Sequence, residues 1–405
     1  MAQALEGIKV IEAASVLAGP MCGRLLADWG ADVIHVEHPV RGDMSRYRIT
    51  GLQSGRSILS DINYSWENHN RNKRGITLDL SQESGREIIH KMVGTADVFL
   101  TNFRQRDLGK FKLEYGTLSQ LNPELIYACL SGYGRKGMSK DLPGFESTGY
   151  FAQSGMCRVL VASGEHLTQN PLGLGDYITG LCLSYGIMVA LFARERTGIG
   201  QEVDTSLFQA GVFGISYDIA GALVTGHDRQ PVERKDITNA LVNFYRTKDG
   251  RWLRLCVEQP DLYWSRVCQG IGLEGLEHDP RFESFEPRIK NHIALFNILE
   301  EVFATKTLAE WKVELDKAGL PWAPVQTLPE VIADPQARAN DFFVPLEHPT
   351  HGRIEVVANP VKLSKTPASV RMPAPEFSQH TEDILLELGY TWENIERFKK
   401  QRVIA

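Results

Sequence analysis

The chain has 405 residues, of which 43% are hydrophobic and 23% charged, and its net charge is −6. This composition supports a folded core, and we find no run of about 18 apolar residues to span a membrane, which excludes disordered, fibrous and membrane-spanning proteins. The acidic balance excludes a general nucleic-acid binder. Six cysteines without metal-ligand spacing and an N-terminus without a signal-peptide pattern predict a cytoplasmic protein with reduced thiols and no bound metal.

Up to Arg135 the sequence alternates short apolar runs with helical patterns. Strands are predicted at Ile8–Ile11, Asp32–Glu37, Gly75–Leu80, Asp97–Thr101 and Leu125–Ser131. Helices are predicted at Ala18–Trp29, Glu83–Val93 and Leu113–Gln120. Strands that alternate with helices at this spacing indicate an α/β protein with a doubly wound parallel sheet.

The second half of the chain changes character at a polar segment, Gly226–Asp236, which is typical of a linker. Before it we predict a long apolar helix at Thr179–Arg196, a strand at Gln201–Ser206 and a helix at Leu207–Val224. After it we predict a hairpin at Asn239–Cys256, short helices up to Gly319, strands at Leu320–Pro324 and Val356–Val361, and a helix at Thr381–Gly389. We therefore expect a large domain over 1–226, a smaller inserted α+β domain over 227–325, and a segment, 326–405, that completes the large domain.

One motif is misleading. Gly132–Gly137 matches GxGxxG and follows a predicted strand. A dinucleotide site needs a helix that begins inside this motif, and Asp141–Gly144 would break such a helix at once. The sequence therefore predicts no nicotinamide site.

Two basic clusters are candidates for binding an anion. Asn70–Arg74 precedes a strand and contains Arg71, Lys73 and Arg74, whereas Asn102–Arg106 follows a strand. The second cluster contains Asn102, Phe103, Arg104 and Arg106, in which an aromatic ring stands between an amide and two guanidinium groups. Because ligands dock at the carboxyl ends of parallel strands, these residues suit an adenine and its phosphates. A solvated charged surface explains the clusters equally well.

Two carboxylates lie near predicted glycine-rich loops. Asp176 precedes the long apolar helix, where it would act as a nucleophile on a tight loop or as an ordinary helix cap. Glu146, in Pro143–Glu146, is a candidate partner carboxylate or a surface charge of a loop. The sequence contains neither a GxSxG elbow nor a phosphate-binding P-loop.

Over nearly its whole length the chain resembles the family III CoA-transferases, which include formyl-CoA:oxalate and carnitine CoA-transferases and are related to α-methylacyl-CoA racemase. The matching motifs are Leu5–Val10, Ala18–Pro20, Leu26–Ile34, Asn70–Leu80, Ala96–Val98, Asn102–Arg104, Leu130–Gly134, Pro143–Glu146, Gly175–Asp176, Arg194–Gly198 and Gly200–Gln201. The resemblance implies a Rossmann-like large domain and an intertwined homodimer, and it leaves open a heterodimer with a paralogue.

The resemblance also implies a mechanism. Asp176 would attack an acyl-CoA donor such as succinyl-CoA, and the reaction would pass through an aspartyl anhydride and an aspartyl-CoA thioester to a carboxylic acid acceptor, with Glu146 beside it. CoA thioesters would be substrates, with no permanently bound cofactor. The implied CoA contacts are Val16, Leu17, His38 and the two basic clusters, with Phe103 near the adenine.

Three departures from the family narrow the function. The racemases carry a histidine where this chain has Phe145, which cannot transfer a proton, so an acyl-CoA racemase or isomerase is the less favoured alternative. The oxalate-using members carry a glutamine in place of Leu17 and a run of glycines that is missing here, which indicates a less polar acceptor. Asn239–Trp252 and Leu262–Trp264 resemble members that act on aromatic or branched acids. The other alternative is that the chain is one subunit of a heteromeric CoA-transferase.

Overall fold

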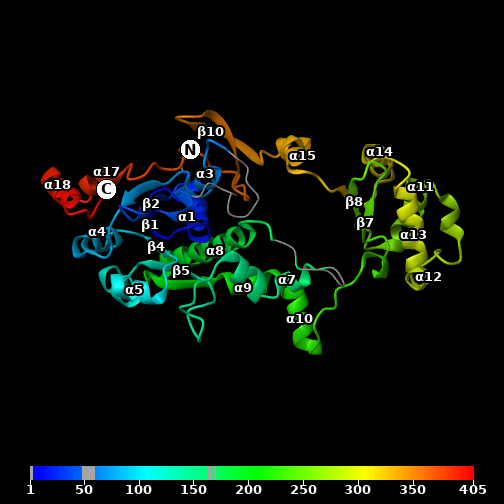
Figure 1. Ribbon diagram of the computed structural model, residues 1–405, viewed down its shortest axis with the longest axis horizontal. Helices are drawn as coiled ribbons and strands as arrows, with labels where there is room; N and C mark the ends of the chain where they lie inside the picture. The colour runs from blue at the N-terminus through cyan, green and yellow to red at the C-terminus, as the bar shows by residue number, and fades with distance from the viewer. Residues whose placement is uncertain (1–2, 48–59, 162–166, 168–169) are drawn as a thin grey trace. The chain divides into compact units, whose positions relative to one another are not determined.

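The structure, a computed structural model, describes residues 3–47, 60–161, 167 and 170–405. The chain forms two compact units (Figure 1). The first comprises Met1–Leu160, Leu167–His227 and Arg338–Ala405, and the second comprises Asp228–Ala337. The bounds predicted for a small domain, 227 and 325, differ from the second unit mainly at its C-terminal end.

The first unit is built on a six-stranded sheet in which every strand pair is parallel. Its strands are β1 (Lys9–Ala13), β2 (Asp32–Glu37), β3 (Arg74–Thr77), β4 (Val98–Thr101), β5 (Ile126–Ser131) and β6 (Gln201–Ser206). Each corresponds to a predicted strand, so the predicted parallel α/β sheet is confirmed.

The strand order, β3-β2-β1-β4-β5-β6, is that of a Rossmann-like fold. The chain runs outward from β1 to β3 and then returns to place β4 on the other side of β1, with Val10 beside Val98. The loops that leave β1 and β4 therefore diverge at one point on the carboxyl edge of the sheet. In open α/β sheets this switch point is where ligands bind.

Helices cover both faces of the sheet. On one face Ile11, Ile34 and Phe99 pack in a core with five helices, two of them from the C-terminus. These helices are α4 (Glu83–Val93), α5 (Gln105–Phe111), α6 (Tyr115–Leu121), α17 (Thr381–Glu387) and α18 (Trp392–Lys400). The backbone N–H of Thr77 in β3 donates to the Thr381 hydroxyl at 3.1 Å, so the chain end is joined to the edge of the sheet.

The opposite face is covered by α1 (Ala18–Asp28), a π-helix (Ser147–Gln153), α8 (Leu174–Thr197) and α9 (Leu207–Gly214) (Figure 1). Helices α1 and α8 approach closely at Gly180, where a Cβ atom would lie 2.7 Å from the Ala18 carbonyl oxygen. The remaining elements of this unit are α2 (Met44–Tyr47), α3 (Tyr64–Asn70), α7 (Met156–Val159), α10 (Ser216–Thr225) and the hairpin β10 (Phe343–His348) and β11 (Gly352–Val357). Helix α16 (Pro335–Ala339) contains the point in the chain, between Ala337 and Arg338, where the second unit ends and the first resumes.

Two expectations about helices change. The predicted helix Leu207–Val224 is two helices, α9 and α10, bent by 77°. Among the described residues, helix α8 is long and apolar enough to cross a membrane, although the sequence analysis excluded a membrane-spanning helix. Helices α9 and α10, taken together as a bent pair, also meet this criterion of length and hydropathy. Leu183, Ile187 and Ala190 of α8 are buried against the sheet, so the inner face of this helix belongs to the protein core.

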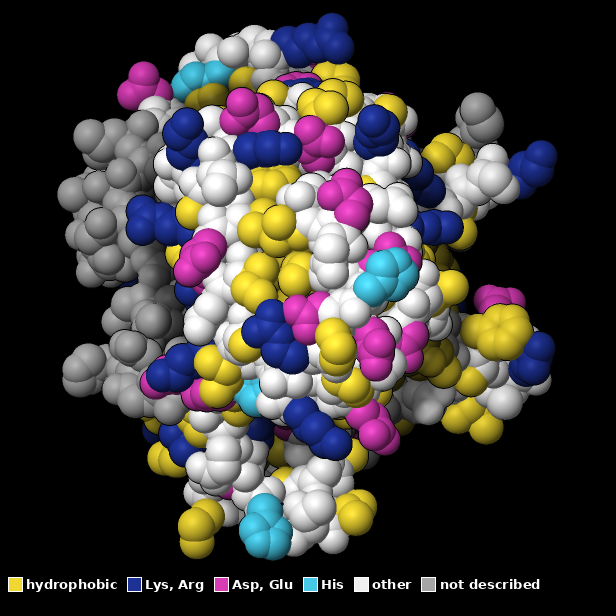
Figure 2. Space-filling view, turned by 90° about the vertical axis from the view of Figure 1, so that its right-hand side faces the viewer, with side chains coloured by type: hydrophobic (Ala, Val, Ile, Leu, Met, Phe, Trp, Pro, Cys, Tyr) yellow, Lys and Arg dark blue, Asp and Glu magenta, His cyan; other side chains and the backbone are white. Residues whose placement is uncertain are grey.

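The second unit joins a three-stranded antiparallel sheet to a layer of helices around its own core, which includes Tyr245, Trp264 and Trp311. Its elements are β7 (Phe244–Arg246), β8 (Trp252–Leu255), α11 (Pro260–Gly270), α12 (Phe285–Lys290), α13 (His292–Phe303), α14 (Leu308–Ala318), β9 (Trp322–Pro324) and α15 (Leu328–Ala333), with single 3-10 turns at Arg234–Asp236 and Glu274–His278. The predicted hairpin turns at Gly250, whose φ is 77°. On the face shown in Figure 2, acidic and basic side chains are interspersed.

Candidate active site

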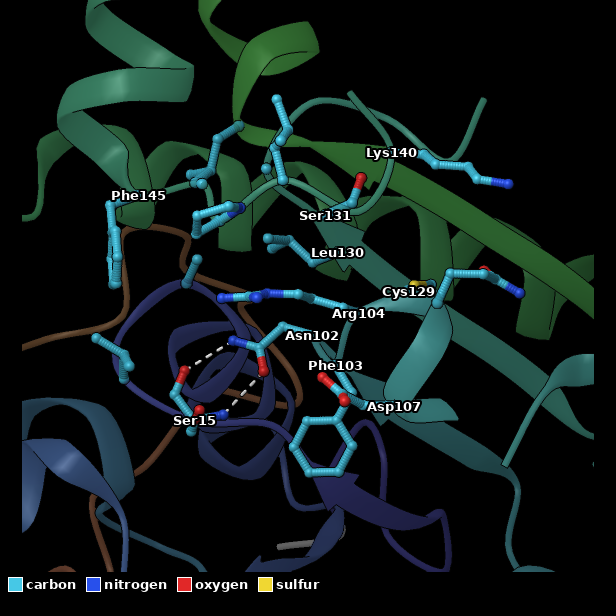
Figure 3. A pocket seen from close by; sticks show the side chains of 18 of the residues that line it. Ser15, Asn102, Phe103, Arg104, Asp107, Cys129, Leu130, Ser131, Lys140 and Phe145 are labelled. Carbon is cyan, nitrogen blue, oxygen red and sulfur yellow. Dashed lines mark hydrogen bonds between the residues drawn. The ribbon is translucent and has the colours of Figure 1, made fainter. Parts of the chain in front are cut away.

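A cavity of about 390 Å³ lies at the switch point of the sheet. The loops that follow β1, β4 and β5 form its walls, and the first turn of α8 contributes Asp176. Apolar side chains gather around it: Leu17, Met44, Leu142, Phe145 and Leu207. Arg104, Arg106, Arg135 and Lys140 add positive charge to the same cavity. Arg104 and Lys140 are labelled in Figure 3.

A second, larger cavity of about 1050 Å³ lies at the carboxyl ends of β1, β2 and β3. It shares Ser15, Met44, Phe103 and Asp107 with the first, so the two adjoin along the same edge of the sheet. Its cationic or titratable basic residues are His38, Arg41 and Lys110. The same cavity is also lined by the carboxylates of Glu37, Asp43, Asp79 and Asp107. Together the two cavities offer room for an elongated ligand.

Asp176 is the third residue of α8 and is 8% exposed. The sequence placed it before the helix, on a loop or as its cap; the structure starts the helix earlier, because Gly173 at φ 87° occupies the cap position and Gly175 is already helical. The carboxylate therefore sits in the first turn of a 24-residue helix. The helix dipole at that end favours negative charge.

Glu146 performs the capping that the cap residue of α8 lacks. Its two carboxylate oxygens accept the backbone N–H groups of Gly173 at 2.8 Å and Gly175 at 2.6 Å. Burial raises the pKa of Glu146, and the N–H groups of Gly173, Gly175 and Asp176 oppose that rise. Glu146 does not line either cavity, so the structure gives it contacts with the backbone around Asp176.

The π-helix that follows Glu146 packs tightly against this turn. A Cβ atom on Gly175 would lie 2.4 Å from Cγ of Tyr150, so only glycine fits there. The hydroxyl of Thr148 also donates to the Phe145 carbonyl oxygen at 3.0 Å. The wall that carries Phe145 and the turn that carries Asp176 are thus joined through one short segment.

Val16 and Leu17 also line the wall of the first cavity, three and four residues after the end of β1. Asn102 holds this wall from the neighbouring strand: its side-chain oxygen accepts the Ser15 N–H at 3.0 Å and its amide donates to the Ser15 carbonyl at 2.7 Å (Figure 3). Asn102 therefore acts on the shape of the cavity as well as lining it.

Phe103 lines both cavities, and its ring packs edge-on against Phe111 at 6.1 Å between centroids. Arg104 and Arg106 line only the first cavity. Figure 3 shows the Arg104 side chain extending into the cavity beside Asn102.

His38 lies in the second cavity, and its Nδ1 accepts the N–H groups of Val40 at 3.1 Å and Arg41 at 3.2 Å. These contacts leave the proton of the neutral ring on Nε2. Partial burial and the charge of Arg41 lower the pKa of His38. A neutral N–H donor at this position suits an anionic or polar ligand.

The first basic cluster lies elsewhere, and this corrects the expectation that its cations face a ligand. Arg71 is buried and pairs with Asp28 at 3.0 Å, and Lys73 is buried and pairs with Glu12 at 2.8 Å. Arg74 pairs with Asp32 and Glu387, each at 2.7 Å. None of the three lines either cavity. For Arg71 and Lys73, contact with a ligand would break buried ion pairs, which is costly because it leaves a charge without its partner.

Sequence reasoning missed Arg41, Asp43 and Lys110. Lys110 follows Arg106 by four residues on α5, so both stand on one side of that helix at the edge of the sheet. This spacing could have predicted from the sequence that Lys110 lies near the ligand site. Asp43 gave none, because its contacts are with residues distant in the sequence.

The GxGxxG motif does not begin a dinucleotide-binding helix, as the residues that follow it predicted. Residues 132–145 contain no helix. A Cβ atom on Gly132 would lie 2.7 Å from the Cα of Gly144, so the glycine allows two backbone segments to touch. The motif shapes a wall of the first cavity.

The fold and the site define an α/β enzyme whose ligand groove crosses the switch point of a Rossmann-like sheet and ends at a buried carboxylate. The chain belongs to CoA-transferase family III, whose model matches residues 5–381. It is therefore a CoA-transferase that uses CoA thioesters as substrates.

Three similar proteins cover almost the whole chain. (R)-2-Hydroxy-4-methylpentanoate CoA-transferase of Clostridioides difficile is 34% identical over 99% of both chains. Cinnamoyl-CoA:phenyllactate CoA-transferase of Clostridium sporogenes is 35% identical over 98% of this chain and 97% of its own. The crystal structure of a CAIB/BAIF family protein from Brucella suis matches with a TM-score of 0.83 at 29% identity, covering 96% of this chain and 100% of that chain.

Proposed function

We propose that this enzyme transfers CoA from an acyl-CoA donor, such as succinyl-CoA, to a 2-hydroxy acid with a branched or aromatic side chain. The observation that carries the proposal is the position of Asp176, a buried carboxylate at a helix N-terminus in a cavity whose walls combine apolar side chains with cationic ones. The names of the two similar transferases, which refer to a branched and an aromatic 2-hydroxy acid, support this acceptor class.

Asp176 acts as the nucleophile. Its carboxylate attacks the donor thioester carbonyl, so that a C–O bond forms, the C–S bond breaks, and the products are a mixed anhydride and CoA thiolate. The thiolate then attacks the Asp176 carbonyl; the donor acid leaves as a carboxylate and Asp176 carries CoA as a thioester. Each step exchanges one activated acyl bond for another, so little free energy is lost to hydrolysis.

The acceptor reverses these two steps. Its carboxylate attacks the Asp176 thioester and releases CoA thiolate, which attacks the acceptor carbonyl of the new anhydride and frees Asp176. The burial of Asp176 supports this route, because water would hydrolyse both intermediates. Arg104, in the same cavity, is suited to hold the incoming carboxylate.

We place the nucleotide end of CoA in the second cavity. His38, Arg41 and Lys110 supply donors for its phosphates, and Phe103 with Phe111 offers aromatic surface for the adenine. Val16, Leu17, Asn102 and Arg106 then line the path between the nucleotide and Asp176.

A racemase or isomerase on this fold is less well supported. Removing and returning an α-proton requires two opposed titratable groups. The position beside Glu146 in the cavity wall is Phe145, and Glu146 itself holds backbone N–H groups.

We further propose that two copies associate. Several large apolar side chains on α8, α9 and α10 are well exposed, including Tyr185, Phe213, Tyr217 and Val224. Apolar surface of this kind marks interfaces. Light scattering of the purified protein should give twice the chain mass; a monomer would contradict the proposal, and co-purification of a related second chain would indicate the heteromeric form.

The test of function is a trapping experiment. The protein is incubated with succinyl-CoA and a panel of aliphatic, branched and aromatic acids, then treated with hydroxylamine or borohydride and digested. We expect modification at Asp176 and CoA transfer to a branched or aromatic 2-hydroxy acid. Asp176→Ala should lose both, whereas Glu195→Gln, a carboxylate at the far exposed end of α8, should lose neither. Exchange of the α-proton without CoA transfer would contradict the proposal.

A further inference from the structure

The wall of the Asp176 cavity contains a strained residue. Val16, three residues after the end of β1, has φ 72°. A β-branched side chain rarely adopts this left-handed conformation, because its Cβ substituents crowd the backbone. Such a conformation persists only where surrounding contacts hold it in place.

Two side chains hold the backbone here. The Asp43 carboxylate accepts the Val16 N–H, at 3.1 Å to Oδ2 and 3.3 Å to Oδ1. One residue earlier, Asn102 binds both the N–H and the carbonyl of Ser15 (Figure 3). Two consecutive residues are therefore held from two neighbouring loops, Ser15 from the loop after β4 and Val16 from the loop after β2.

Asp43 is itself held firmly. Its backbone N–H donates to Glu37 at 2.9 Å, and Glu37 pairs with Arg46 at 2.6 Å. The N–H and hydroxyl of Ser45 both donate to Oδ1 of Asp43 at 2.6 Å. The carboxylate is almost fully buried, with His35 Nε2 at 3.8 Å from Oδ2. The strain at Val16 is thus opposed by a group that cannot easily move.

We propose that Asp43 is a positioning residue of the CoA-transfer site: by holding the Val16 N–H it keeps Ser15–Ala18 in the shape that faces Asp176. Without Asp43, Val16 relaxes toward negative φ, its peptide plane turns, and the entry into α1 shifts within the cavity. This inference rests on the proposed function, since the affected step is acyl transfer at Asp176. Asp43 lines the second cavity but acts here through Val16.

The test is a double-mutant cycle with Asp43→Ala and Val16→Gly. Asp43→Ala should lower kcat/KM by about tenfold or more. Glycine adopts positive φ without the Cβ penalty, so the wall needs less support when Val16 is replaced. In the Val16→Gly background the effect of Asp43→Ala should therefore shrink by about fivefold. Equal losses in both backgrounds would overturn the proposal.

Two further measurements separate the possible failures. Ser45→Ala removes one hydrogen bond to the Asp43 carboxylate but leaves the Ser45 N–H on the same oxygen and the Val16 contact intact, so it should lower kcat/KM by clearly less than Asp43→Ala does. The same cycle can be measured by denaturant unfolding, which does not depend on activity. Asp43→Ala should lower the free energy of unfolding less in the Val16→Gly protein than in the wild type. Additive losses would contradict the inference that Asp43 stabilises the conformation of Val16. Trapping at Asp176 in the wild type tests the proposed function independently of both cycles.

Discussion

The carboxylate of Glu146 accepts the backbone N–H of Gly175 at 2.6 Å, one residue before Asp176. Together with the bond to Gly173 at 2.8 Å, this contact fastens the first turn of α8 to the cavity wall that contains Phe145. A loop residue 30 positions away in the chain thus supplies the cap that the helix sequence lacks, which places Asp176 in the cavity.

Replacing Glu146 should slow the reaction through position. Glu146→Ala leaves two buried N–H groups without acceptors, which costs about 1–3 kcal/mol of unfolding free energy. The displaced Asp176 should lower kcat by about 10- to 100-fold with a smaller change in KM. Glu146→Gln keeps one good acceptor oxygen and should be intermediate in both respects. Complete loss of activity in a stable Glu146→Gln protein would instead indicate direct participation of its carboxylate in the chemistry.

Gly175 should tolerate no side chain. In Gly175→Ala the new Cβ would meet the ring of Tyr150, and overpacking of this kind costs about 1–3 kcal/mol. Gly116→Ala is the matched control, because Gly116 lies in α6 with no atom within 4 Å of the new Cβ, and alanine should there add about 0.5–1 kcal/mol. Denaturant unfolding of the two variants gives the comparison. Equal stability of both variants would show that the π-helix yields to the added methyl.

Lys110 should act only on the nucleotide part of the substrate. If the phosphates of CoA lie in the second cavity, Lys110→Ala should raise KM for acyl-CoA by about tenfold, as loss of a charge-assisted hydrogen bond implies. With the corresponding acyl-pantetheine, which has no nucleotide, the variant should match the wild type. Lys317→Ala, an exposed lysine of α14, controls for the change in net charge. An equal effect on both substrates would place the nucleotide elsewhere.

His69 should make the fold sensitive to acid. Burial lowers the pKa of His69 from 6.5 to about 3, with Lys73 and Arg24 adding to the effect, and its Nδ1 contacts the Ser65 carbonyl. Between these pH values the unfolded chain binds a proton and the folded chain does not. Stability is therefore full above pH 6.5 and lost as the pH falls, by about 1.4 kcal/mol per pH unit.

The measurement is the free energy of unfolding at pH 7 and pH 5. The wild type should lose about 2 kcal/mol more than His69→Gln over this range. His227→Gln, which replaces an exposed histidine, should behave as the wild type does. Parallel pH curves for the wild type and His69→Gln would mean that His69 titrates alike in the folded and unfolded chains.

The two basic clusters show where local reading succeeds and where it stops. Arg104 and Arg106 follow β4, and the rule that ligands dock at carboxyl strand ends places them at the cavity. The cluster that contains Arg71 and Lys73 is equally rich in basic residues, but these two side chains point into the protein interior. Their partners, Asp28 and Glu12, lie more than forty positions earlier in the chain, and no local pattern reveals such a pairing.

The start of α8 is a similar case. Two glycines before Asp176 indicated a loop, and the sequence left a helix cap and a nucleophile as alternatives. Gly173 does end the loop, but Gly175 lies inside the helix, and a glycine is needed there because Tyr150 packs against it. The competing explanation, capping, belongs to Glu146.

By itself the sequence determined the six strands of the parallel sheet, the family of the chain and the residues at the carboxyl ends of β1 and β4, because periodicity and strand ends are local properties. The tertiary structure alone decided which charges face the cavity and which neutralise each other inside, and it alone showed the strain at Val16 and the residues opposing it. The physical reason is that burial and ion pairing depend on which distant segments meet, and a one-dimensional pattern does not contain that information.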